Sequence, residues 1–189
     1  MTASLPDPLR VFRKLAQMNR LANQRLHLAC ALLPEGGYAA PRTGFFPSIC
    51  QTLNHILLVD RFYITAMEGG ALDTAALDAA RDCPDMVALS AAQAVEDMRL
   101  LVLIAGLSPQ ALTADVAVNR GDRVQHDRMD DLLSHLFQHQ THHRGQVHAM
   151  LSSTPVAPPQ LDEFIVGDDA EVRMDDMARL GWTEAELMR

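Results

Sequence analysis

The sequence has few aromatic residues, few cysteines and no long apolar run, and each shortage excludes a class of protein. Only 5% of the 189 residues are aromatic, whereas 48% are hydrophobic overall, which is typical of a helical protein rich in Ala, Leu and Met. Cys30, Cys50 and Cys83 lie far apart and form no C-x-x-C motif. They indicate reduced thiols rather than a disulfide framework, so we expect a cytoplasmic protein.

Clusters of positive charge and membrane-spanning segments are missing as well. The formal net charge is −8, and the arginines are scattered along the chain. Nucleic-acid binding needs clustered Lys and Arg to neutralise phosphates, so the sequence does not support it. No stretch reaches the roughly 18 apolar residues that a membrane span requires, and the N-terminus has no apolar signal core. We therefore expect neither nucleic acid nor a membrane as a partner.

The sequence does contain four long segments with helical periodicity, which predict an all-α four-helix bundle. The predicted helices span about residues 8–33, 47–67, 85–105 and 127–152, and the first is capped by Asp7. In the third helix the apolar pattern predicts these buried residues: Met86, Leu89, Ala92, Val95, Met98, Leu100, Val102 and Leu103.

Long connections and a C-terminal extension complete the predicted architecture. Residues 68–86 form a long crossover, with a short helical turn expected over 74–81. Residues 113–128 have no helical period, and the alternation of Val116 and Val118 with polar residues predicts a small β-hairpin before the fourth helix. Three prolines then close a bundle domain of residues 1–154. We expect residues 155–189 to form a short helical extension that packs on the bundle or on a partner subunit.

Five of the eight histidines fall within residues 135–148, and they are not equivalent. On a helical wheel His139 and His143 lie one turn apart inside the apolar stripe of the fourth helix, and His55 lies within the apolar sector of the second. Imidazoles that face a core need partners, and one metal ion satisfies all of them. Because these two faces meet in a bundle, we predict a metal site formed by the three histidines.

Three histidine ligands with a position left for water or substrate are typical of a catalytic rather than a structural metal site. Imidazole suits zinc, nickel, iron and copper. Zinc and nickel are the ions we expect first, with iron, manganese and copper as alternatives.

Other polar residues lie near these histidines in the sequence. Asp60, Arg61 and Arg144 could orient the ligands, since metal-bound histidine usually donates its second N–H to an oxygen, but an interhelical ion pair is the commoner role. Gln146 lies beside the ligands on the wheel and could contact a bound water or substrate, or form an interhelical hydrogen bond. The remaining histidines are interpreted as rim residues (His135 and His142) or surface residues (His27, His126 and His148).

The motifs around the three histidines resemble those of a known family. The stretch HQTHHRGQVHAML over residues 139–151, preceded by RMDDLLSHLF, is similar to the helix-four signature of the DinB/YfiT-like family. SICQTLNHILLVDRFY over residues 48–63 resembles that family's helix-two motif. The family is distinct from the DNA polymerase that shares the DinB name. The resemblance covers residues 8–151 and implies a four-helix bundle, typically a homodimer, with His55, His139 and His143 as metal ligands.

Two functions follow from the residues and the resemblance. Related proteins include S-transferases that use bacillithiol and a mycothiol-dependent maleylpyruvate isomerase, which implies a metal-dependent enzyme. Such an enzyme would be a thiol-dependent S-transferase or a hydrolase acting on a small-molecule substrate, with a low-molecular-weight thiol or a water activated by the metal. The alternative is a non-catalytic stress-response dimer whose metal braces the bundle. An open metal position favours the enzyme, and a fourth protein ligand favours the brace.

Overall fold

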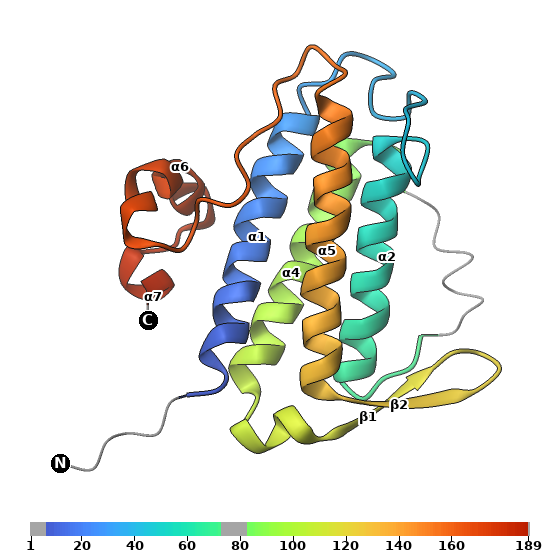
Figure 1. Ribbon diagram of the computed structural model, residues 1–189, viewed down its shortest axis with the longest axis vertical. Coiled ribbons are helices and arrows are strands. Elements are labelled where there is room, and N and C mark those ends of the chain that lie inside the picture. Colours follow the sequence, from blue (N-terminus) through green and yellow to red (C-terminus); the bar gives the residue numbers. More distant parts are fainter. Residues whose placement is uncertain (1–6, 73–82, 189) are drawn as a thin grey trace.

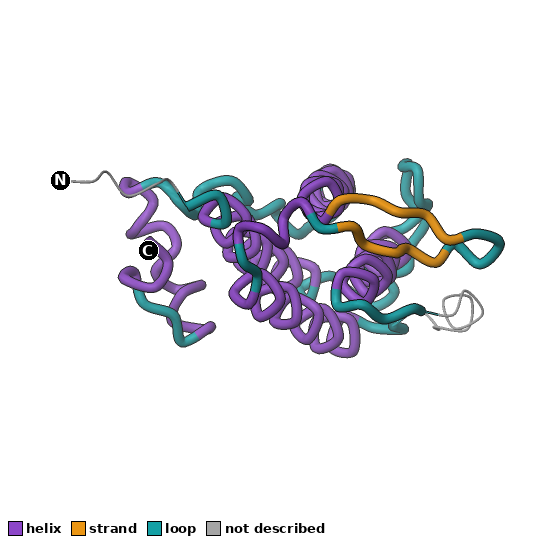
Figure 2. Tube along the Cα trace, turned by 90° about the horizontal axis from the view of Figure 1, so that it is seen from below, coloured by secondary structure: helices purple, strands orange, loops and turns teal. Residues whose placement is uncertain are grey.

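The computed structural model describes residues 7–72 and 83–188, and within them four long helices lie side by side (Figures 1 and 2). These helices are α1 (Arg10–Cys30), α2 (Ile49–Met67), α4 (Met86–Gly106) and α5 (Met129–Leu151). The predicted all-α four-helix bundle is therefore confirmed. The helical turn expected over residues 74–81 lies outside the described residues. None of the described helices has the length and hydropathy needed to cross a membrane.

The ends of the helices follow local capping chemistry. At the start of α2, the Ser48 hydroxyl accepts a hydrogen bond from the Gln51 amide at 3.1 Å, and at the start of α4, Asp85 accepts one from the Ala88 amide at 2.8 Å. Helix α1 is shorter at both ends than predicted. Asp7 caps the Leu9 amide at 2.9 Å just before the helix, and the residues after Cys30 continue as tighter turns.

A two-stranded hairpin closes one end of the bundle, as the sequence predicted. After a short 3-10 helix, η1 (Pro109–Thr113), strand β1 (Asp115–Asn119) pairs antiparallel with β2 (Val124–Arg128), and β1 lies against α2 (Figure 2). Val116 and Val118 are buried, which explains their alternation with polar residues. Gly121 has a φ of 87°, a conformation that glycine adopts without a steric penalty. The hairpin thus lies against the C-terminal part of α2, where Arg120 of its turn reaches Tyr63.

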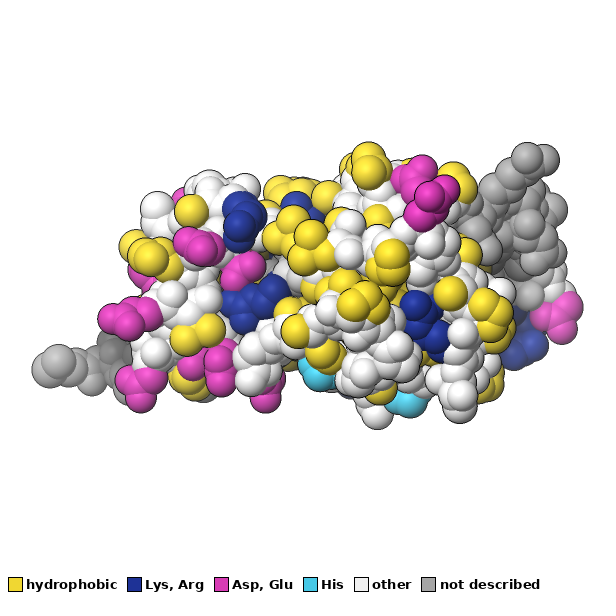
Figure 3. Space-filling view, turned by 90° about the horizontal axis from the view of Figure 1, so that it is seen from above, with side chains coloured by type: hydrophobic (Ala, Val, Ile, Leu, Met, Phe, Trp, Pro, Cys, Tyr) yellow, Lys and Arg dark blue, Asp and Glu magenta, His cyan; other side chains and the backbone are white. Residues whose placement is uncertain are grey.

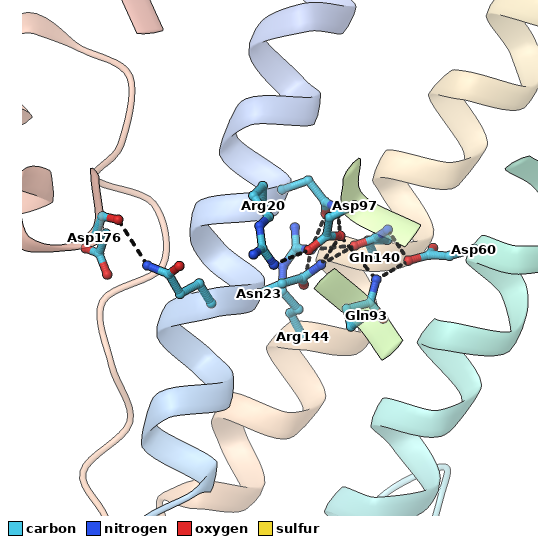
Figure 4. A network of polar contacts seen from close by, with 10 residues as sticks. Arg20, Asn23, Asp60, Gln93, Asp97, Gln140, Arg144 and Asp176 are labelled. Atoms are coloured by element: carbon cyan, nitrogen blue, oxygen red, sulfur yellow. Dashed lines mark hydrogen bonds and ion pairs between the residues drawn. The ribbon is translucent and has the colours of Figure 1, made fainter. Parts of the chain in front are cut away.

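A polar layer divides the core of the bundle into two apolar halves. One half contains Leu132, Leu133 and Leu136 of α5, and the other contains Val147, Met150 and Leu151 farther along the same helix. Between the halves each long helix contributes buried polar residues, which are Asn19 and Asn23 of α1, Asp60 of α2, Gln93 and Asp97 of α4, and Gln140 and Arg144 of α5 (Figure 4). We call this set the polar layer.

The polar layer explains why the prediction for the third helix was partly wrong. Val95, Met98 and Val102 of α4 were expected to be buried, but they are 57%, 48% and 68% exposed. The inward positions beside them are occupied by Gln93, Glu96 and Asp97, which are all at most 5% exposed. Because α4 carries apolar residues on its outer face and polar residues on part of its inner face, hydropathy alone assigns the wrong face.

The C-terminal extension packs on α1 of its own chain (Figure 1). It comprises η2 (Gly167–Asp169), α6 (Ala170–Leu180) and α7 (Glu184–Met188). Its apolar side is buried in a cluster of Leu21, Ala22, Phe164, Met177 and Leu187, and Arg25 of α1 forms an ion pair with Asp176 of α6. In Figure 3, seen from above, acidic side chains gather over the end of the molecule that this extension forms.

Candidate metal centre

Three histidines from two helices meet at one point. His55 of α2 and His139 and His143 of α5 each offer one ring nitrogen, and these nitrogens all lie within 4.8 Å of one another. The Nε2 atoms of His55 and His139 are 3.0 Å apart, and the three rings lie 4.4 to 4.9 Å apart between centroids. The structure thus brings together the three residues that the sequence singled out.

The donor set and its spacing fit a transition-metal ion. Zinc–nitrogen bonds of 2.0–2.1 Å in a tetrahedral arrangement place ligand nitrogens about 3.3 Å apart, close to the separation of the His55 and His139 nitrogens. Neutral imidazole is a common ligand of zinc, nickel, copper and iron. Within the described residues, no cysteine or carboxylate joins the group. The cluster can therefore supply three ligands, and a small molecule from outside would complete the coordination.

The three rings are neutral at neutral pH. Burial, with smaller contributions from His143 and His55, lowers the pKa of His139 to about 3. Burial also lowers the pKa of His55, with a contribution from His143, and it lowers the pKa of His143, where a hydrogen bond to Gln146 opposes the shift. Because only a neutral imidazole has a lone pair to offer, the cluster is poised to bind a metal without first losing protons.

Gln146 lies next to the cluster and connects two histidines. Its Oε1 is 2.8 Å from Nδ1 of His143, and its Nε2 is 3.0 Å from Nε2 of His142. The amide oxygen can only accept, so His143 donates through Nδ1 and keeps Nε2 available for a metal. Nδ1 of His139, by contrast, is buried and has no hydrogen-bond partner among the described residues. In the part of the chain that the structure describes, the oxygen that usually orients a ligating histidine is thus present for His143 and absent for His139.

An aromatic side chain that sequence reasoning missed covers one edge of the cluster. The ring of Phe46, from the loop before α2, lies 4.5 Å from that of His55 and 5.7 Å from that of His143. The available signal was the Phe45–Phe46 pair, just before the Ser48 cap in a chain with few aromatic residues. His55 and His139 nevertheless stay partly exposed, so the cluster remains open to a ligand from solvent.

The charged residues considered as supports for the ligands have their hydrogen bonds elsewhere, and Figure 4 shows those of Asp60 and Arg144. Oδ2 of Asp60 accepts hydrogen bonds from Gln93 and Gln140, both at 2.6 Å. Arg61 donates to Glu96 at 3.1 Å. Arg144 donates to three amide oxygens, those of Asn19, Asn23 and Gln140. These contacts belong to the interhelical role that the sequence analysis weighed as the commoner one.

The other histidines lie outside the cluster, and one of them contradicts its sequence assignment. His126, His135 and His142 are exposed. His27 was interpreted as a surface residue, but it is only 7% exposed, and burial lowers its pKa to about 3, with smaller contributions from Arg20 and Arg144. It is a neutral core histidine of α1. Hydropathy did not identify His27 as buried, because α1 also contributes the buried polar residues Asn19 and Asn23, so its inner face is not uniformly apolar.

Comparisons with known proteins agree with the geometry. The sequence model described as the DinB family matches residues 2–174, which is nearly the whole chain. The chain is also similar to Protein DinB of Bacillus subtilis (strain 168), with 27% identity over 154 residues that cover 79% of this chain and 89% of the relative. The matched region contains both helices that supply the histidine cluster.

Proposed function

The chain belongs to the DinB family, and from this membership and the three-histidine cluster we propose that it is a metal-dependent enzyme that transfers a small thiol to an electrophilic molecule. The observation that supports this proposal most is the open cluster itself. Three neutral imidazoles converge, two of them are partly exposed, and no fourth side-chain ligand joins them within residues 7–72 and 83–188. Zinc or nickel is the ion we propose, in a cytoplasmic protein.

The polar layer argues against a metal that only braces the bundle. Hydrogen bonds and charges in this layer already connect all four long helices without a metal (Figure 4). A bracing ion would add little to that connection, and it would be expected in a closed four-ligand site rather than at a partly exposed edge.

The proposed reaction divides the work between the ion and the protein. When bound, a divalent ion supplies positive charge that lowers the pKa of a thiol beside it. The thiol loses its proton to solvent, its sulfur forms a bond to the electrophilic carbon, and the leaving group departs with the electrons of the bond that breaks. Gln146 holds His143 in the tautomer whose Nε2 faces the cluster, and Phe46 shields one edge from water.

A thiol-transfer assay tests this function. The zinc- or nickel-loaded protein is mixed with glutathione, bacillithiol or mycothiol and a chromogenic aryl halide, and we expect product formation that depends on the metal. The metal-stripped protein is the control and should lose at least about 100-fold of the rate, since the ion supplies several kcal/mol of charge stabilisation. Stoichiometric metal binding without turnover for any thiol would contradict thiol transfer and favour hydrolysis or a bracing role.

We also propose that two copies of the chain associate through the outer face of α4. Val87, Val95, Met98 and Val102 form an exposed apolar stripe at helical spacing, with exposed fractions between 48% and 81%. A continuous apolar stripe of this kind is typical of an association surface, and a twofold axis would bury two copies of it against each other.

Introducing a charge into this stripe should separate the copies. Met98→Glu places a carboxylate near the middle of the stripe, where association would desolvate it, so we expect a shift from dimer to monomer in sedimentation velocity. Val172→Glu on α6 is the matched control, because Val172 is 49% exposed and belongs to the extension that packs on α1 (Figure 1). A dimer that persists in Met98→Glu would show that α4 is not the interface.

A further inference from the structure

A row of rings leads from the histidine cluster along the line where α2 and α5 meet, and it ends at an arginine. The ring of His139 lies 6.1 Å from that of His135, which lies 5.1 Å from that of Tyr63. The Tyr63 hydroxyl accepts a hydrogen bond from Nη2 of Arg120 at 3.1 Å. Arg120 belongs to the turn of the hairpin, so the hairpin brings a positive charge to the far end of this row.

Arg120 is held in position without being neutralised. Its Nε donates to Gln125 at 3.3 Å, and its guanidinium carbon lies 5.2 Å from the centre of the Phe62 ring and 5.5 Å from that of Tyr63. Within the described residues it forms no ion pair, and its Nη1 makes no hydrogen bond. The nearby carboxylate of Asp127 instead accepts a hydrogen bond from Gln125 at 2.8 Å. An oriented guanidinium with unused donors has the geometry that binds a carboxylate.

The surface between the histidine cluster and Arg120 suits an extended molecule. His55 and Tyr63 are eight residues apart on α2, which corresponds to a rise of about 12 Å. Val59 and Phe62 lie between them at positions i+4 and i+7 from His55, so they share its side of the helix, and both are only partly buried. A ligand could thus reach from the cluster to Arg120 across an apolar stretch.

We propose that Arg120 binds a carboxylate at the far end of the substrate, and that it selects acidic thiols about 12 Å long over neutral ones. This inference rests on the proposed function, since it assigns the thiol end to the histidine cluster. The charge-assisted pair at this partly exposed position should favour the acid about tenfold in affinity. Arg120 is a specificity residue in this scheme, and the metal is held without it.

Calorimetric titration of the zinc-loaded protein tests the proposal with two probes of equal length. Mercaptooctanoate and mercaptooctanol differ only in the terminal group, and we expect the acid to bind about tenfold more tightly. Arg120→Gln should abolish this preference, and Arg120→Lys should keep part of it, because lysine retains the charge but not the planar pair of donors. Arg123→Gln is the matched control from the same turn, since Arg123 is exposed and already paired with Asp122.

The zinc content of each sample separates the two proposals. Equal affinity for acid and alcohol in a wild-type protein that binds zinc would overturn the role of Arg120 while leaving the metal site intact. A preference that survives in Arg120→Gln would overturn it as well. A wild-type protein that binds no zinc would overturn both proposals. Mercaptopropionate, which is too short to reach the hairpin, should bind wild type and Arg120→Gln equally, and a loss of its affinity in the variant would indicate a general disturbance instead.

Discussion

Replacing His139 by alanine is expected to abolish metal binding while leaving the helix content of the protein largely unchanged. The ring of His139 is one corner of the cluster and lies 4.9 Å from that of His55 and 4.4 Å from that of His143. Its loss leaves two ligands on separate helices. Since even supporting residues contribute 10- to 100-fold to metal affinity, the loss of a ligand should exceed about 100-fold. Zinc affinity by competition with a chelating dye and metal content after dialysis measure this effect.

His135→Ala is the matched control for this variant. His135 lies one helical turn before His139 on α5, it is exposed, and it does not belong to the three-histidine group. Its replacement should leave the metal stoichiometry at one ion per chain. Unchanged zinc affinity in His139→Ala, or an equal loss in His135→Ala, would show that the ligands have been assigned wrongly.

Replacing Arg144 by methionine should lower the free energy of unfolding by about 3–5 kcal/mol, the range observed when one partner of a buried charge network is removed. Arg144 is 7% exposed, and burial lowers its pKa to about 10, while Asp97 and Asp60 oppose that shift. Methionine fills a similar volume but donates no hydrogen bond. The variant therefore leaves the amide oxygens of Asn19 and Asn23 without this donor and removes one of the two donors to the Gln140 oxygen. It also removes the positive charge that faces the buried carboxyl groups of Asp97 and Asp60. Urea unfolding of the metal-free protein measures the change.

Two further variants provide a control for Arg144→Met and a test of its coupling to Asp60. Arg123→Met removes an exposed arginine of the hairpin, so its unfolding free energy should change by no more than about 0.5 kcal/mol. Asp60→Asn in the Arg144→Met background removes a carboxyl group whose pKa burial already raises well above its ordinary value. This double variant should regain part of the lost stability, since the two residues share one network. A loss below about 1 kcal/mol in Arg144→Met would contradict the central role of the polar layer.

The helices and the cluster were predictable because their signals are local. Helical periodicity and the valine alternation before the hairpin both act over a few residues, and the structure agrees with both. The i, i+4 spacing of His139 and His143 is also local, and His55 followed from one assumption, namely that α2 and α5 face each other. They do, and the cluster lies between them.

The polar layer escaped prediction because it depends on contacts between helices. Hydropathy assigns Gln93 and Asp97 to the outer face of α4, but in the structure Gln93 donates to Asp60 of α2 and Asp97 accepts from Asn23 of α1. The same contacts turned Val95, Met98 and Val102 outward. A buried polar residue is stable only when its partner arrives from another element, and hydropathy along one helix carries no information about that partner.

The sequence by itself determined that this chain folds into four amphipathic helices and that two of them present histidines toward a common interior. Only the tertiary structure decided that Asp60 and Arg144 belong to a network between the helices, that Gln146 and Phe46 adjoin the cluster, and that the hairpin brings Arg120 alongside α2. The physical reason is the range of the forces involved. Backbone hydrogen bonds and side-chain periodicity depend on residues a few positions apart. The partners of a buried charge, and the residues around a metal site, are distant in the chain and meet only on folding.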